Sequence, residues 1–268
     1  LKPFQRATVD QVADVFYGRQ SGKRYLVADE TGLGKSIVAR GVVAKAVEEL
    51  QDDPTVNRID IVYICSNADI ARQNLQRLNI VGNQVSMSTR LTLLATSTRQ
   101  LSKPTPGVGK PVNLISLTPR TSFPEKGWRT GTAKERALLY LILRDELALG
   151  GARATAGYRI LQGTVTTWQS FKHRVQQLEN DLRAQAESDG GPLLDPVIVK
   201  KFVELLRTLD DEHELSALDE FTQLLDDTQG KPSVPGGSKA AAQVVIRLRR
   251  LLARAGVEAL EPDLVILD

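Results

Sequence analysis

The chain has 268 residues, of which 41% are hydrophobic, 25% charged and 5% aromatic, as in soluble globular proteins with a largely aliphatic core. A formal net charge of +3 permits a polyanionic partner without requiring one. The single cysteine, Cys65, excludes an internal disulfide and a cysteine-based zinc cluster. Such cysteine usage is typical of a reducing cytoplasm, so we expect a cytoplasmic protein. No apolar run is long enough to span a bilayer, and we expect no membrane partner.

The first part of the chain alternates between helical and strand patterns. Amphipathic helices are expected over residues 1–17, 36–50 and 68–78, and buried strands over residues 25–28, 59–65, 85–89, 112–118 and 264–267. A long loop is expected over residues 96–110, which are rich in Ser, Thr, Pro and Gly. Strands that alternate with helices form mostly parallel sheets with helices on both faces. The fold class predicted here is therefore α/β.

Helical periodicity dominates the region between Pro119 and Pro262. Helices are expected there over residues 133–149, 168–186, 196–209, 215–225 and 240–255. We therefore predict two domains. One is an α/β lobe made of residues 1–123 and 261–268, and the other is a large inserted helical subdomain over residues 124–260.

Four arginines lie on the last predicted helix of this insert: Arg247, Arg249, Arg250 and Arg254. A charge run of this kind is usually a solvated face, and that is the interpretation favoured here. The alternative is that the arginines contact nucleic acid.

A glycine-bearing turn follows the strand over residues 25–28: Asp29-Glu30-Thr31-Gly32-Leu33-Gly34-Lys35-Ser36. A strand, a glycine turn and then a helix form the context of a phosphate-binding loop, because Gly32 and Gly34 allow backbone N–H groups to surround an anion. The helix adds its positive N-terminal end. Lys35 supplies a cation for the outer phosphates, and the Ser36 hydroxyl is a Mg²⁺ ligand. The alternative is a glycine-containing loop that only caps a helix.

Polar residues follow several of the predicted strands: Ser66 and Asn67, Thr118, and Asp268. The carboxyl ends of parallel strands lie along one edge of a sheet, where α/β proteins bind their ligands. Asp268 ends an apolar strand, and in nucleotide hydrolases with a phosphate loop such a carboxylate helps to hold Mg²⁺. For Ser66, Asn67 and Thr118 the alternative is simple strand termination and helix capping.

The octapeptide over residues 29–36 resembles motif I of superfamily 2 helicases, in the form used by Swi/Snf-type DNA translocases, which also begins with Asp. Other segments resemble the neighbouring motifs in the family's order: residues 1–5, 63–73, 117–119 and 264–268. The resemblance covers residues 1–123 and the last residues, and the helical block has no counterpart. Similar long-insert helicases occur in bacterial anti-phage and restriction-associated systems.

The resemblance implies the N-terminal RecA-like ATP-binding lobe of an ATP-dependent DNA translocase or helicase, with ATP and Mg²⁺ as cofactors. It implies catalytic roles for Lys35 and Asp268, Mg²⁺ ligation by Ser36 and Asp268, and a contact from Gln5 to adenine. The nucleotide-binding set that it implies is Gln5, Thr31, Gly32, Leu33, Gly34, Lys35 and Ser36. The set implied for the backbone of nucleic acid, in the first place double-stranded DNA, is Ser66, Asn67, Arg72, Thr118 and Arg120.

The sequence also departs from the family's pattern. Thr31 and Ser36 stand where the usual motif has Met and Thr. The Glu expected after Asp268 and a second RecA-like lobe are not among the 268 residues, so we expect a fragment of a longer ATPase that is inactive alone. The alternative function is a phosphate-loop ATPase switch or sensor whose helical insert docks a protein, without motor activity on nucleic acid.

Overall fold

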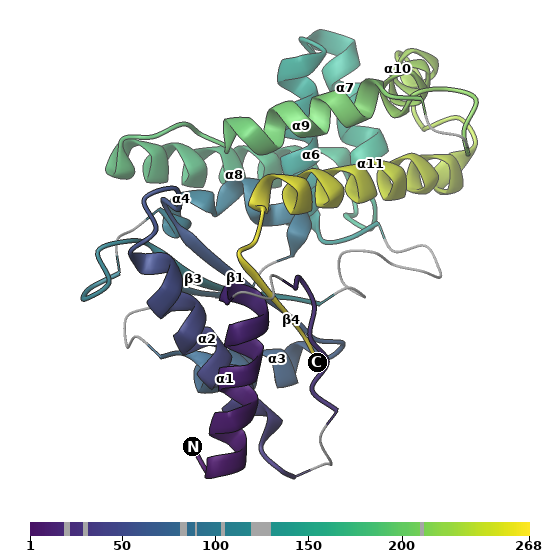
Figure 1. The fold of residues 1–268 in the computed structure, drawn as a ribbon. Coiled ribbons are helices and arrows are strands. Elements are labelled where there is room, and N and C mark those ends of the chain that lie inside the picture. The colour runs from purple at the N-terminus through teal and green to yellow at the C-terminus, as the bar shows by residue number, and fades with distance from the viewer. Residues whose placement is uncertain are drawn as a thin grey trace. The chain divides into compact units, whose positions relative to one another are not determined.

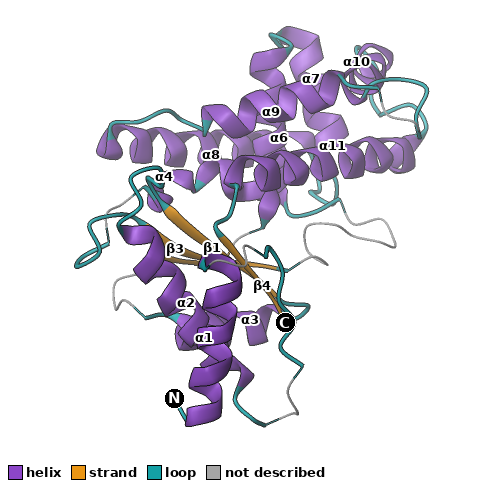
Figure 2. Cartoon of the chain, in the orientation of Figure 1, coloured by secondary structure: helices purple, strands orange, loops and turns teal. Residues whose placement is uncertain are grey.

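The computed structural model shows a mixed α/β protein that is mostly helical and contains a small parallel sheet (Figure 1, Figure 2). It describes residues 1–18, 22–28, 32–80, 85–88, 90–102, 105–118, 130–209 and 212–268. No helix within these ranges is both long and apolar enough to cross a bilayer.

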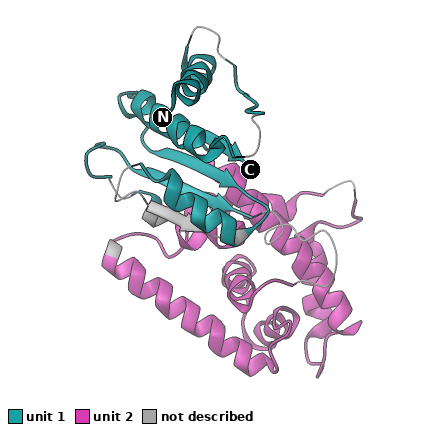
Figure 3. Cartoon of the chain, turned by 90° about the horizontal axis from the view of Figure 1, so that it is seen from below, with its two compact units in different colours: residues 1–89, 100–119, 261–268 teal, residues 90–99, 120–260 magenta. Residues whose placement is uncertain are grey.

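The chain divides into two compact units, which Figure 3 colours separately. The first unit contains residues 1–89, 100–119 and 261–268. The second unit contains residues 90–99 and 120–260. Residues 90–99 therefore group with the helical part of the chain rather than with the sheet.

The first unit is built around four described strands, all parallel, in the order β2-β3-β1-β4. They are β1 (Ile59–Ile64), β2 (Val85–Ser88), β3 (Val112–Leu117) and β4 (Leu264–Leu267). Strand β1 pairs with β3 from Ile59 opposite Val112 onward, and nearly all residues of both strands are buried. Burial along the whole strand is typical of strands covered on both faces, and here it includes the polar residues Asp60, Asn113 and Ser116. The predicted combination of helices with a parallel sheet is confirmed.

The strand predicted over Tyr25–Ala28 is wrong, because these residues pair with no strand in the described part of the chain. Tyr25 and Val27 pack against the core of the first unit, whereas Leu26 is 84% exposed. An apolar run becomes a strand only when a neighbouring strand satisfies its backbone groups. The sequence of this segment specifies which side chains face inward but not a hydrogen-bonding partner.

Three helices of the first unit, α1 (Pro3–Tyr17), α2 (Lys35–Gln51) and α3 (Ala68–Leu78), confirm the helices predicted for it. Two short helical segments, η1 (Leu91–Thr96) and α4 (Thr98–Leu101), fall in or near the region predicted as a loop over residues 96–110. That prediction is wrong for residues 98–101. Helices of one or two turns are too short to leave a periodic apolar pattern in the sequence.

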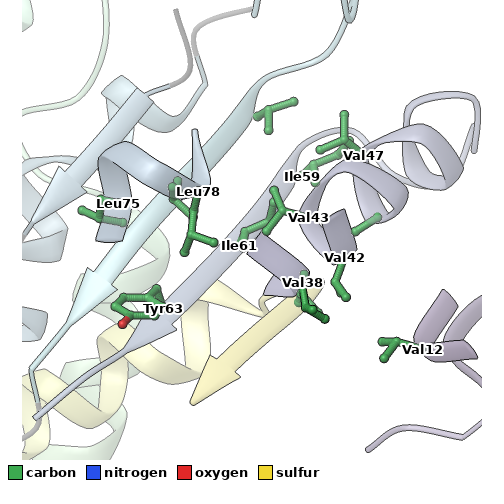
Figure 4. Close-up of a cluster of buried hydrophobic side chains, with 14 of the residues drawn as sticks. Val12, Val38, Val42, Val43, Val47, Ile59, Ile61, Tyr63, Leu75 and Leu78 are labelled. Atoms are coloured by element: carbon green, nitrogen blue, oxygen red, sulfur yellow. The ribbon is translucent and has the colours of Figure 1, made fainter. Parts of the chain in front are cut away.

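The core of the first unit gathers apolar side chains from α1, α2, α3 and the sheet (Figure 4). Its members labelled there are Val12, Val38, Val42, Val43, Val47, Ile59, Ile61, Tyr63, Leu75 and Leu78. The four valines of α2 recur at helical spacing, so they share one face of that helix. Packing of this face places the N-terminus of α2, and with it the glycine turn, beside the sheet.

Gly41 lies where α2 approaches α1 most closely, since an added Cβ would be 2.6 Å from Cγ2 of Val9. We expect Gly41→Ala to lower stability, because overpacking costs about 1–3 kcal/mol and exceeds the gain of up to about 1 kcal/mol in helix propensity. Urea unfolding measures the change. The double variant Val9→Ala/Gly41→Ala should regain part of the loss relative to the sum of the single changes. A Gly41→Ala protein more stable than wild type would contradict the close approach.

The second unit contains six long helices in its described part: α6 (Ala133–Glu146), α7 (Gly151–Leu161), α8 (Trp168–Asp189), α9 (Pro196–Arg207), α10 (Ala217–Thr228) and α11 (Gly237–Leu260). The sequence pattern does not predict α7, because its glycines lower its helix propensity. Gly157 faces Tyr140 of α6, and an added Cβ would lie 3.1 Å from the tyrosine ring. The missing side chain thus permits packing that outweighs the weak local preference.

Candidate functional site

The turn before α2 has the conformation that its glycines predict. Gly32 and Gly34 have φ values of 93° and 85°, in the left-handed region that favours glycine. Gly34 is the N-cap of α2, and as a glycine it has no side chain to accept from the first N–H groups of the helix. The first turn also contains no acidic residue. This helix end is therefore suited to an external anion. Thr31, predicted as part of the loop, lies outside the described residues.

Gln5 of α1 contacts this turn directly. Its side-chain Nε2 donates to the carbonyl oxygen of Leu33 at 3.0 Å, and its Oε1 accepts from the backbone N–H of Lys2 at 2.9 Å. A Cβ at position 34 would lie 2.7 Å from Gln5 Nε2 and would displace this amide, whereas the positive φ is what requires glycine there. Gln5 thus ties the glycine turn to α1, and a contact from Gln5 to adenine stays a prediction.

A cavity of about 550 Å³ lies within the first unit beside the start of α2. The polar residues that line it include Lys35, Ser36, Tyr63, Asn74 and Asp268, from four places in the chain, together with the cations Lys23 and Arg24. The remaining lining is mainly apolar and includes Phe16 of α1 and Val27. The structure therefore brings together Lys35, Ser36 and Asp268, which the sequence analysis assigned to one site.

Asp268 directly follows β4 and is hydrogen-bonded to two buried side chains. The Tyr63 hydroxyl donates to Asp268 Oδ2, and Asn74 Nδ2 donates to the same oxygen at 3.2 Å and to Tyr63 Oη at 2.7 Å. Burial, together with the hydrogen bond to the Asp268 carboxylate, raises the pKa of Tyr63 well above its ordinary value. The phenol is therefore a hydrogen-bond donor across the physiological pH range.

Tyr63 and Asn74 are not among the residues predicted for the site. One signal for Asn74 is present, because it occupies the apolar stripe of α3 formed by Ala71, Leu75 and Leu78, all of which are buried. A polar residue on a buried stripe requires a hydrogen-bond partner. Tyr63 lacks such a signal, since a tyrosine within a buried strand is an ordinary core residue.

The residues predicted to contact nucleic acid lie partly at the carboxyl edge of the sheet. Strands β1, β3 and β4 end together there, as shown by the bonds from Cys65 N to Leu117 O at 3.2 Å and from Asp268 N to Ile64 O at 2.9 Å. Ser66 is exposed beyond β1, and Thr118 is half-buried beyond β3. The expectation that these strand ends share one edge is confirmed, and Arg120 lies outside the described residues.

Asn67 and Arg72 have local partners. The Asn67 side chain caps α3 by accepting from the N–H groups of Asp69 at 2.8 Å and Ile70 at 3.3 Å. The exposed Arg72 pairs with Asp69 at 3.3 Å on the surface of the same helix. The capping alternative named for Asn67 is thus observed, whereas a contact with nucleic acid stays a prediction for both residues.

The solvated basic face predicted on the last inserted helix is wrong for two of its four arginines. Arg249 is 1% exposed and its Nη2 donates to Glu135 Oε1 at 2.7 Å. Arg247 is 8% exposed and pairs with Glu220 at 2.8 Å. Helix α11 packs against several other helices of the second unit, so it is covered on more than one side, and Arg247 and Arg249 lie on covered sides. Arg250 and Arg254 are exposed, as predicted.

Comparisons with protein-family models, with curated proteins and with solved structures found no match. Among the described residues, no group of three or more His, Cys, Asp and Glu is arranged to hold a metal ion by itself. Cys65 is a free thiol buried in the core, in the role of a small apolar residue.

Proposed function

We propose that this chain is the ATP-binding lobe of an ATP-dependent DNA translocase or helicase, with a RecA-like fold. The observation that carries the proposal is the meeting of Lys35, Ser36 and Asp268 in one cavity at the N-terminus of α2. Further support comes from the parallel sheet, whose strand ends meet along one edge, where α/β proteins bind ligands.

The cavity residues fit a nucleotide that carries Mg²⁺. The hydroxyl of Ser36 and the carboxylate of Asp268 are the hard oxygen ligands that Mg²⁺ prefers. The N–H groups at the start of α2 and the ammonium group of Lys35 would hold the phosphates. Bound Mg²⁺ would neutralise negative charge on the phosphoryl group that is transferred. The apolar lining from residues such as Phe16 suits the less polar part of a ligand.

The motor function requires contacts outside this cavity. On the basis of the resemblance described above, we assign contacts with the DNA backbone to five residues: Ser66, Asn67, Arg72, Thr118 and Arg120. A second RecA-like lobe in the full-length protein would close on ATP and reopen after hydrolysis, which moves the protein along the duplex. Contacts with phosphates give affinity that is independent of sequence and falls steeply with salt.

A second candidate function is an ATPase switch or sensor whose helical unit docks a protein. The observation that favours it is the internal pairing of Arg247 with Glu220 and of Arg249 with Glu135. These two cations of the helical unit neutralise carboxylates of the same unit, so they do not form a surface for phosphates. The two candidates share the nucleotide site and differ in affinity for DNA.

Two binding measurements on the purified chain test the proposal. Fluorescent ATP should bind weakly in the presence of Mg²⁺, because one lobe supplies only part of a nucleotide cleft. A labelled DNA duplex should bind with an affinity that falls steeply between 50 and 200 mM salt, as phosphate contacts require. Absence of any Mg-ATP binding would overturn both candidates. Mg-ATP binding without salt-sensitive binding of DNA would favour the switch.

A further inference from the structure

Asp268 differs in solvent exposure from Tyr63 and Asn74, the two residues that donate hydrogen bonds to it. Asp268 itself is exposed, whereas Tyr63 is 2% and Asn74 is 7% exposed. Tyr63 comes from β1 and Asn74 from α3, so each is anchored in the core of the first unit by a different element. The exposed carboxylate is therefore attached to a rigid, buried pair of donors.

Both donors use the same carboxylate oxygen. Tyr63 Oη and Asn74 Nδ2 each donate to Oδ2, and Asn74 also donates to Tyr63 Oη at 2.7 Å. The three side chains are therefore hydrogen-bonded to one another in a closed network. Within the described part of the chain, Oδ1 takes no part in this network. An aspartate at a strand tip would otherwise rotate freely about its side-chain bonds. The network instead leaves one defined oxygen, Oδ1, available to a cation.

We propose that Tyr63 and Asn74 are positioning residues that orient the Asp268 carboxylate for Mg²⁺. The inference rests on the proposed function, because it requires Asp268 to be a Mg²⁺ ligand. Hydrogen bonds to a ligating carboxylate restrict it to a productive orientation, and their loss typically lowers metal affinity 10- to 100-fold. A tyrosine that served only to fill the core would need its ring but not its hydroxyl.

Tyr63→Phe removes the hydroxyl and keeps the ring. We expect the Mg²⁺ concentration that gives half-maximal binding of fluorescent ATP to rise about 10-fold, whereas the affinity for the nucleotide in EDTA stays at the wild-type value. Asn74→Leu removes the second donor, keeps a similar volume on an apolar stripe, and should shift the Mg²⁺ midpoint in the same direction. Tyr17→Phe is the matched control, because Tyr17 packs against the same core but does not line the cavity.

The outcomes separate this inference from the proposed function. If ATP binding by the wild-type protein does not depend on Mg²⁺, the assignment of Asp268 as a Mg²⁺ ligand is wrong. The positioning inference and the proposed Mg-ATP site are then both wrong. If ATP binding by the wild-type protein depends on Mg²⁺ but both variants have the wild-type Mg²⁺ midpoint, the positioning role is wrong and the proposal of an ATP site is unaffected. Urea midpoints measured without nucleotide show whether either variant loses stability. A shift in the Mg²⁺ midpoint at unchanged affinity in EDTA is an effect that a merely structural role does not produce.

Discussion

Replacing Glu135 by alanine is expected to lower the free energy of unfolding of the second unit by about 3–5 kcal/mol. Glu135 is fully buried at the start of α6. Its Oε1 accepts from Arg249 at 2.7 Å and from Thr92 at 2.6 Å, and its Oε2 accepts from the backbone N–H of Thr132 at 2.6 Å. Removal of the carboxylate takes a charged hydrogen-bond partner away from the buried guanidinium of Arg249, and loss of a buried charge partner is costly.

The pKa of Glu135 predicts how this loss depends on pH. Burial alone would raise that pKa, but hydrogen bonds from Thr92, Thr132 and Arg249 together hold it below its ordinary value of 4.5. A lowered carboxyl pKa stabilises the fold at neutral pH, and this stabilisation is lost as the pH falls through the folded-state value. The difference in free energy of unfolding between wild type and Glu135→Ala should therefore become smaller as the pH is lowered into the acidic range.

Glu258→Ala is the matched control for this experiment. Glu258 accepts from Arg254 at 2.7 Å across one turn of α11, on the surface of the unit. An exposed pair of this kind contributes no more than about 1 kcal/mol. Urea unfolding followed by circular dichroism compares the two variants at pH 7. Equal losses for Glu135→Ala and Glu258→Ala would show that the Glu135 network does not stabilise the unit.

Replacing Lys35 by alanine is expected to lower the affinity for Mg-ATP about 10- to 100-fold. Lys35 is the first residue of α2 and lines the cavity together with Ser36 and Asp268. Its ammonium group is the cationic side chain nearest in sequence to the glycine turn, and a hydrogen bond from a charged group contributes about 1.5–3 kcal/mol. Each 1.4 kcal/mol corresponds to a tenfold change in affinity. Titration of fluorescent ATP in excess Mg²⁺ measures the loss.

Lys45→Ala removes the same charge from the same helix and serves as the control. Lys45 pairs with Glu48 at 2.8 Å on the exposed face of α2 and does not line the cavity. Its replacement should leave the ATP titration unchanged. If Lys35→Ala also binds Mg-ATP as wild type does, the phosphates do not lie at the start of α2 and the proposed site is wrong.

The sequence predicts that Lys35, Ser36 and Asp268 line one site, because local patterns mark the turn, the helix and the strands, and the geometry of a parallel sheet does the rest. The glycines specify the turn, the valines specify the inner face of α2, and the mainly apolar segments at residues 59–65, 112–118 and 264–267 indicate strands, of which β4 is largely exposed. Parallel pairing then places the ends of those strands along one edge by geometry alone. Three local patterns and one rule of topology are sufficient for this part of the site.

The remaining features depend on partners that are distant in the sequence. Tyr63 and Asp268 are 205 positions apart, and Arg249 and Glu135 are 114 apart. No local pattern shows that a tyrosine will meet a carboxylate or that an arginine on a charged helix will be buried. The strand predicted over Tyr25–Ala28 is wrong for the same reason, because an apolar run does not reveal whether a neighbouring strand will be available.

The position of β4 in the sheet has a consequence for the order of folding. Strand β4 pairs with β1, yet Asp60 and Asp263 at the start of this pairing are 203 positions apart, and the whole helical unit lies between them. Contacts this distant close large loops and form slowly, whereas contacts within helical hairpins form early. The helical unit would therefore fold before β4 reaches β1, and its compactness would shorten the loop. A substitution that destabilises the helical unit would then slow the formation of the hydrogen bonds between Asp268, Tyr63 and Asn74.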